Sequence, residues 1–160
     1  MAVEVLGIDH IYIAVSDLEL SVNFYDDVMK LLGFRKGTGK VSGQPLVHYF
    51  NRALQYTLRP ARANAPGHDQ YVPGLHHLCF QVRDTRAVDE VARGLQQLGI
   101  EISDPRLCPE YGADYYAAYF KDPDGVEIEI VNRTRIRNII NDHWEKLEDF
   151  ENPLSKAGLI

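Results

Sequence analysis

Apolar and polar residues alternate along two short segments of the chain, residues 8–15 and 77–82. A period of two is typical of a β-strand that buries one of its faces. We therefore expect two half-buried strands in which the other face carries His10 or His77. Their apolar faces hold Ile11, Ile13 and Val15 in the first segment and Leu78, Phe80 and Val82 in the second.

Each expected strand leads into a segment whose apolar residues recur at helical spacing. The first helix begins at a cap at residues 16–17 and ends at Gly33, and the second begins at residues 84–85 and ends at Gly99. Three further strands are predicted after each helix, with a tight turn at Asp122-Pro123-Asp124-Gly125. They lie at 34–39, 46–50 and 54–58 in the first half, and at 101–104, 115–120 and 126–131 in the second.

The pattern β-α-β-β-β thus occurs twice, which predicts an α+β fold with two tandem modules. Residues 1–59 form the first module, 60–73 a proline-containing linker and 74–132 the second module, within one structural domain. Residues 133–160 form a C-terminal segment with an amphipathic helix at 134–150 and an irregular tail at 152–160. An unpaired apolar stripe on that helix favours a homodimer.

The two modules also repeat a short phrase. Glycine, histidine, the apolar residue after it, valine and aspartate recur in register 67 positions apart, from Gly7 to Asp17 and from Gly74 to Asp84. Each copy therefore carries one histidine at the same place, His10 or His77. Two copies of a module that each bring one histidine can assemble a metal site where they meet.

Glu129 is the third candidate for that site. It alternates with Ile128 and Ile130, so it lies on the face opposite the core, where an acidic residue is costly unless it is paired or coordinated. Two histidines and one carboxylate, His10, His77 and Glu129, form a set that suits Fe²⁺, Mn²⁺, Ni²⁺ or Zn²⁺ and leaves positions open for substrate.

Composition narrows the class of partner. The net charge is −6 and the pI is near 5.5, which disfavours nucleic acid and favours a small-molecule substrate. No signal peptide and no run of about 20 apolar residues is visible, so we expect a cytoplasmic protein without a membrane partner. Cys79 and Cys108 show no disulfide pattern.

At this point the sequence resembles the vicinal oxygen chelate superfamily, which includes glyoxalase I, extradiol dioxygenases and bleomycin-resistance proteins. The resemblance covers about residues 6–132 and rests on the segments around His10 and on residues 120–129. It implies a curved mixed β-sheet cup with flanking helices and one divalent metal. It also implies that His10, His77 and Glu129 are the metal ligands.

The first module departs from the family at a fourth ligand position. Alignment of its last strand with that of the second module places Thr57 opposite Glu129, and Gln55 lies on the same face. We keep both residues as a possible fourth ligand or substrate contact. Glyoxalase I has a glutamate at this position, so the sequence disfavours a glyoxalase I identity.

The resemblance leaves the reaction class open. A metal-dependent lyase, isomerase or epimerase that chelates an oxygen-rich substrate is favoured, with Tyr119 as the catalytic residue. An extradiol dioxygenase ranks second, because residues 110–112 lack the histidine of that signature. A non-catalytic drug- or metabolite-binding protein is the third reading. The substrate pocket is expected to include Tyr12, Tyr115, Cys79 and Glu127.

Overall fold

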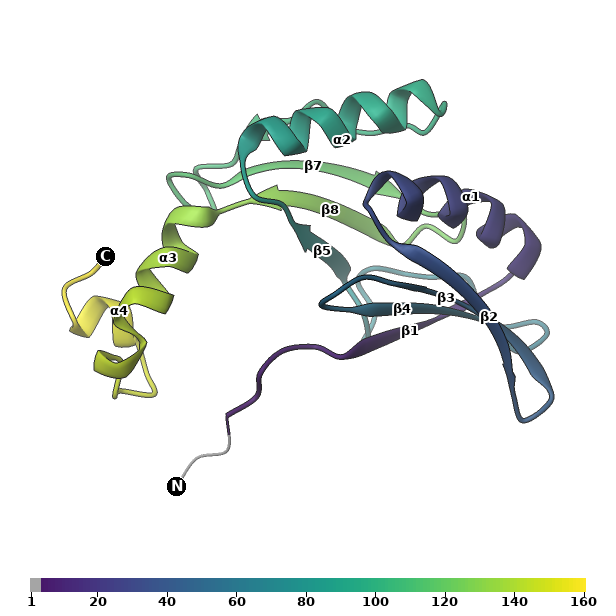
Figure 1. Cartoon of the computed structure of the whole chain (residues 1–160), viewed down its shortest axis with the longest axis horizontal. Helices are drawn as coiled ribbons and strands as arrows, with labels where there is room; N and C mark the ends of the chain where they lie inside the picture. The colour runs from purple at the N-terminus through teal and green to yellow at the C-terminus, as the bar shows by residue number, and fades with distance from the viewer. Residues whose placement is uncertain (1–3) are drawn as a thin grey trace.

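The computed structural model describes residues 4–160, which form two successive β-α-β-β-β units and a C-terminal segment (Figure 1). Module one contains β1 (His10–Val15), α1 (Leu18–Leu31), β2 (Arg35–Val41), β3 (Gln44–Phe50) and β4 (Gln55–Pro60). Module two contains β5 (His77–Gln81), α2 (Thr85–Gln97), β6 (Arg106–Leu107), β7 (Tyr116–Lys121) and β8 (Glu127–Asn132). The α+β fold with tandem modules is confirmed.

Each module forms a four-stranded mixed sheet, and the two sheets have the same topology. The strand orders are β1-β4-β3-β2 and β5-β8-β7-β6. The first strand of each module pairs in parallel with the last, and the other neighbours are antiparallel. Figure 1 shows α1 and α2 on the same side of the sheets, so the opposite side of each sheet is free of these two helices.

The helix-covered faces of both sheets share one hydrophobic core. Phe24 of α1 packs against Phe120 of β7, with ring centroids 6.4 Å apart. Phe80 of β5 packs against Phe34 and Tyr56 of module one, with ring centroids 5.9 and 6.3 Å apart. The two modules therefore bury their apolar faces against each other rather than forming separate domains.

A buried hydrogen-bond network crosses the junction between the modules. The Tyr25 hydroxyl donates to Oδ2 of Asp122 at 2.8 Å and lies 2.8 Å from the Tyr56 hydroxyl. Oδ1 of Asp122 accepts hydrogen bonds from the backbone N–H groups of Asp124 and Val126. Burial raises the pKa of Asp122, while the hydrogen bond from Tyr25 acts in the opposite direction.

The helix ends follow the sequence prediction. The side chains of Asp17 and Asp84 each accept a hydrogen bond from a backbone N–H three residues later, which caps α1 and α2. Gly33 and Gly99 follow these helices with φ of 81° and 75°, a conformation that costs glycine little. No helix in residues 4–160 combines the length and the apolar character that a membrane crossing requires.

Two strand predictions need correction. The first strand begins at His10 rather than at residue 8. The strand expected at 101–104 is wrong, because Ile102 makes only an isolated bridge to Phe120 and the outer strand is β6. Pro105 lies between them, and its missing N–H prevents a continuous ladder.

The C-terminal segment also differs from the prediction. The helix expected at 134–150 ends early: α3 spans Thr134–His143 and is followed by a 3₁₀ turn, Trp144–Lys146. The tail at 152–160 is not irregular, since it contains the short helix α4 (Pro153–Lys156). Proline at the first turn of a helix is favourable, because its fixed φ suits the helix and its missing N–H costs nothing there.

Replacement of Tyr25 tests the junction. Tyr25→Phe removes the hydroxyl that satisfies both Asp122 and Tyr56, so we expect a loss of about 1–3 kcal/mol in unfolding free energy. Urea denaturation measures this change in unfolding free energy. The control is Tyr71→Phe, where a largely exposed hydroxyl is lost and the change should stay within about 0.5 kcal/mol. Equal effects of the two substitutions would contradict the role of the network.

Candidate metal-binding site

We call the side of each sheet that faces away from α1 and α2 its open face. Along β1 the apolar residues Ile13 and Val15 are buried, whereas His10 and Tyr12 are exposed. In β5 the residues His77, Cys79 and Gln81 are likewise more exposed than Leu78 and Phe80. The predicted alternation is thus observed, and both histidines lie on open faces.

Glu129 lies in the middle of the open face of module two, yet it is only 1% exposed. In the strand register it is paired with Cys79 on β5 and with Tyr119 on β7, so these three residues share a face. A small second cluster of Cys108, Ala117 and Val131, with Tyr115 and Tyr119 packed against it, buries this part of the sheet. The carboxylate is therefore held away from water.

Two side chains contact the buried carboxylate. Nε2 of His77 lies 3.3 Å from Oε2 of Glu129, and the Tyr115 hydroxyl donates to Oε1 at 2.6 Å. Burial raises the pKa of both Tyr115 and Tyr119 well above the usual value, and Glu129 raises it further, first through the hydrogen bond at Tyr115 and through its negative charge at Tyr119. Both phenols therefore stay protonated at neutral pH and can act as hydrogen-bond donors.

The two predicted histidine ligands are oriented in the same way by the residue that precedes each of them. Nδ1 of His10 lies 2.8 Å from Oδ1 of Asp9, and Nδ1 of His77 lies 2.8 Å from Nδ1 of His76. Such contacts fix the orientation of a ring, and the hydrogen-bond network assigns its tautomer. Nε2 of His77 faces Oε2 of Glu129.

The chemistry of these donors fits a divalent cation. A carboxylate can accept about four hydrogen bonds, and Glu129 receives one short bond from Tyr115 besides the contact with His77. A buried carboxylate with so few partners is costly, and a bound cation offsets that cost. His77 and Glu129 thus form two-thirds of the predicted ligand set.

The third predicted ligand lies apart from this pair. His10, whose side chain is 53% exposed, contacts Asp9 and packs edge-on against the Tyr12 ring at 5.3 Å. Within residues 4–160, no three His, Cys, Asp or Glu side chains are grouped so that they could hold a metal ion. A single copy of the chain therefore does not bring His10 together with His77 and Glu129.

The sheet registers relate Thr57 to Glu129. Tyr12, two residues after the first histidine, pairs with Thr57, just as Cys79, two residues after the second, pairs with Glu129. This is the equivalence that the sequence alignment predicts. Thr57 is fully buried and its Oγ1 accepts a hydrogen bond from Nε2 of Gln55 at 3.1 Å. Module one thus has a neutral hydroxyl where module two has a carboxylate.

The remaining predicted pocket residues lie on the open face of module two or beside it. The residue Cys79 is exposed overall, but partial burial of its thiol and the nearby Glu129 raise its pKa, so the thiol remains protonated. Oε1 of Glu127 accepts a hydrogen bond from Nε2 of Gln70 at 3.1 Å. Tyr119 is partly buried beside Glu129.

Two residues, Gln70 and His48, were not predicted as part of a site, although the first contacts site residues and the second lies on an open face. Gln70, from the linker, contacts Nδ1 of His76 at 3.3 Å and so supports the ring next to His77. His48 pairs with Thr57 as Tyr119 pairs with Glu129, which places it on the open face of module one. Alignment of the third strands of the two modules is the signal that identifies His48.

Comparison with known proteins supports the two-module description. A family model described as the Glyoxalase/Bleomycin resistance protein/Dioxygenase superfamily matches residues 7–130. The chain is 28% identical over 125 residues to the uncharacterised protein YqjT of Bacillus subtilis, and the match covers 76% of this chain and 95% of that protein. It is 30% identical over 128 residues to a virulence protein of Salmonella typhimurium, which covers 77% of this chain and 81% of the relative.

Solved structures agree with this fold. The crystal structure of a glyoxylase/bleomycin resistance protein/dioxygenase domain from Frankia sp. EAN1pec superposes with a TM-score of 0.68 at 21% sequence identity. The match covers 81% of this chain and 98% of that structure. At this identity the likeness supports the fold, and the chemistry of the site has to be argued from the residues.

Replacement of Tyr115 tests its contact with the carboxylate. Tyr115→Phe removes the short hydrogen bond to buried Glu129, and we expect a loss of about 1–2 kcal/mol in unfolding free energy, measured by denaturation with a chelator present. Tyr12→Phe is the matched control, because that hydroxyl is exposed and its loss should change little. The proposed contact is wrong if Tyr115→Phe is as stable as the control.

Proposed function

The chain belongs to the glyoxalase/bleomycin resistance protein/dioxygenase superfamily, and we propose that it is a metal-dependent enzyme acting on a small, oxygen-rich substrate. The observation that carries this proposal is Glu129, a carboxylate that is 1% exposed and lies 3.3 Å from a histidine nitrogen. A structural role alone does not explain it, because apolar residues of similar size stabilise a core at least as well as a buried ion pair.

His77, Glu129 and His10 are the proposed ligands of one divalent metal, which is Fe²⁺, Mn²⁺, Ni²⁺ or Zn²⁺. When bound, such an ion supplies a Lewis acid that binds two neighbouring substrate oxygens and lowers the energy of a developing oxyanion. Thr57, the module-one counterpart of Glu129, is neutral and hydrogen-bonded to Gln55. It serves as a weak fourth ligand or a substrate contact, which leaves room for chelation.

The protonated phenols beside Glu129 supply the other half of the proposed chemistry. Tyr119 is the proposed catalytic residue, because its hydroxyl can donate a hydrogen bond to a substrate oxygen or pass on a proton. Tyr115 orients Glu129, and Tyr12, Cys79 and Glu127 line the pocket. Proton transfer at a carbon next to a chelated oxygen is the chemistry that these groups suit, so we favour a lyase, isomerase or epimerase.

A second copy of the chain is the proposed source of the third ligand. His10 and the pair His77–Glu129 lie on the open faces of different modules, and the shared core holds those modules together on their other faces. Two copies can place the open face of module one against that of module two from the partner, twice by symmetry. The proposed homodimer thus has two sites, each with His10 from one copy.

Metal analysis tests the ligand set. For protein purified without a chelator, we expect about one divalent metal per chain, and loss of that metal in His10→Ala, His77→Ala and Glu129→Ala, since each substitution removes one of three ligands. His143→Ala is the control, because this histidine lies on α3 and contacts the backbone oxygen of Ile139. Stoichiometric metal in all three ligand variants would overturn the proposed site.

Mixing of variants tests the assembly. His10→Ala and Glu129→Ala are each expected to bind no metal, but a heterodimer of the two has one intact site and one site with both defects. After unfolding and refolding together, random pairing should restore metal to about a quarter of the sites. Co-refolding of either variant with itself is the control. A site formed within one chain predicts no recovery at all.

A further inference from the structure

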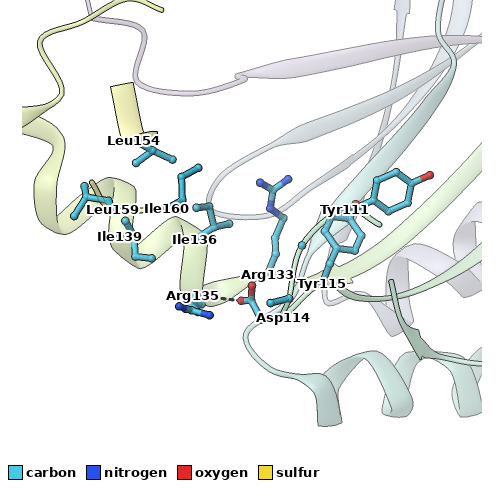
Figure 2. Close-up of a pocket in the computed structure, with 12 residues that line it drawn as sticks. Tyr111, Asp114, Tyr115, Arg133, Arg135, Ile136, Ile139, Leu154, Leu159 and Ile160 are labelled. Atoms are coloured by element: carbon cyan, nitrogen blue, oxygen red, sulfur yellow. Dashed lines mark hydrogen bonds between the residues drawn. The ribbon is translucent and has the colours of Figure 1, made fainter. Parts of the chain in front are cut away.

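The C-terminal segment forms one wall of a pocket of about 500 Å³ beside module two (Figure 2). The opposite wall is the loop before β7, residues 111–115. Residues 133–160 lie beyond the range matched by the family model, so this wall is an addition to the two-module fold. Its apolar side chains come from α3, α4 and the end of the chain: Ile136, Ile139, Leu154, Leu159 and Ile160.

Arg133, just before α3, is also part of the lining of this pocket. Its guanidinium carbon lies 5.6 Å from the centre of the Tyr115 ring, a cation–π arrangement. Its Nε is buried without a hydrogen-bond partner among residues 4–160, and Arg133 makes no ion pair with any of them. A buried N–H without a partner costs free energy, so a ligand that accepts from this group gains affinity.

The lining also contains two other charged residues, Asp114 and Arg135. Oδ2 of Asp114 accepts a hydrogen bond from the backbone N–H of Arg135 at 2.9 Å, and Figure 2 shows these two residues together, apart from the Arg133 guanidinium. Arg133 is therefore the cation of the lining that lies over an aromatic ring and has a buried N–H without a partner, next to an apolar wall.

This combination points to one chemical class of ligand. A guanidinium stacked on an aromatic ring keeps its N–H edge free, and that edge matches a planar carboxylate with two parallel hydrogen bonds. The apolar side chains suit a hydrocarbon or aromatic body, and the volume is in the usual range for a small organic ligand. A phosphate with two charges and no apolar body would leave most of this lining unused.

Tyr115 connects the pocket to the candidate metal site, because its ring contacts Arg133 while its hydroxyl binds Glu129. We propose that the C-terminal segment makes a specificity pocket for a substrate that is an organic acid with an apolar body, bound by Arg133. This inference rests on the proposed function for the reaction at the neighbouring metal. The recognition of the acid depends only on the residues of the pocket.

Calorimetric titration with 4-phenylbutyrate tests the proposal on the full-length protein. We expect the wild-type protein to bind this acid, and Arg133→Gln to weaken the affinity at least tenfold. Arg133→Lys, which keeps the charge but loses the two-pronged geometry, should fall between them. The uncharged analogue 4-phenylbutan-1-ol should bind the wild-type protein and Arg133→Gln equally. Arg137→Gln, an exposed arginine of α3 outside the pocket lining, is the control.

The proposal is overturned if wild-type protein does not bind 4-phenylbutyrate, or if Arg133→Gln binds it as tightly as the control variant does. Thermal unfolding of each variant shows that it is folded. Measurement of the metal content distinguishes a failure of the pocket proposal from a failure of the proposed function. If no form of the protein holds metal but His77→Ala still binds the acid with wild-type affinity, only the proposed function fails. If metal content is normal but Arg133→Gln binds the acid with wild-type affinity, only the proposed pocket fails.

Discussion

The buried hydrogen bond from Tyr25 to Asp122 determines how the two modules sit against each other. Tyr25 comes from α1 of module one, and Asp122 comes from the turn that leads into β8 of module two. The other carboxylate oxygen of Asp122 holds that turn, and Oδ2 of Asp124 accepts from the backbone N–H of Ser16 after β1. One turn thus ties the start of β8 to Ser16, directly after β1, and to Tyr25 in the middle of α1. The junction buries the helix-covered faces of both sheets in one core, and the candidate metal ligands lie on the open faces.

Glu129 lowers the stability of the fold, because it is a buried carboxylate in the candidate site. Its strand neighbours Ile128 and Ile130 belong to the shared core, and the alternation along β8 directs Glu129 to the other face. The Glu129 side chain is nevertheless held away from water, since it is 1% exposed and Tyr115 and Tyr119 lie beside it. A carboxylate there loses its hydration and recovers only part of that free energy from one phenol and one histidine. A strand built for stability alone would carry an apolar residue at this position.

The periodicity of the sequence predicted the features of the fold that depend on local sequence. The faces of β1 and β5 and the helix caps follow from residues close together in sequence, and the equivalence of Thr57 with Glu129 follows from the alignment of the two repeats. The strand at 101–104 failed because Pro105 interrupts the ladder, and α4 was missed because a four-residue helix gives no periodic signal. The pocket around Arg133 was beyond prediction for another reason. It joins a loop at 111–115 to residues 133–160, and contacts between irregular segments leave no repeat in the sequence.

The difference between Thr57 and Glu129 also determines the charge of the proposed site. Two neutral histidines and one carboxylate leave a divalent cation with one net positive charge. A second carboxylate at Thr57 would cancel that charge and weaken the binding of any anionic substrate oxygen. Arg133 adds a further positive charge close by, since it lies over the same tyrosine that holds Glu129. Thr57 in place of a carboxylate and Arg133 at the start of the C-terminal segment thus have the same effect, because both favour the binding of an acidic substrate.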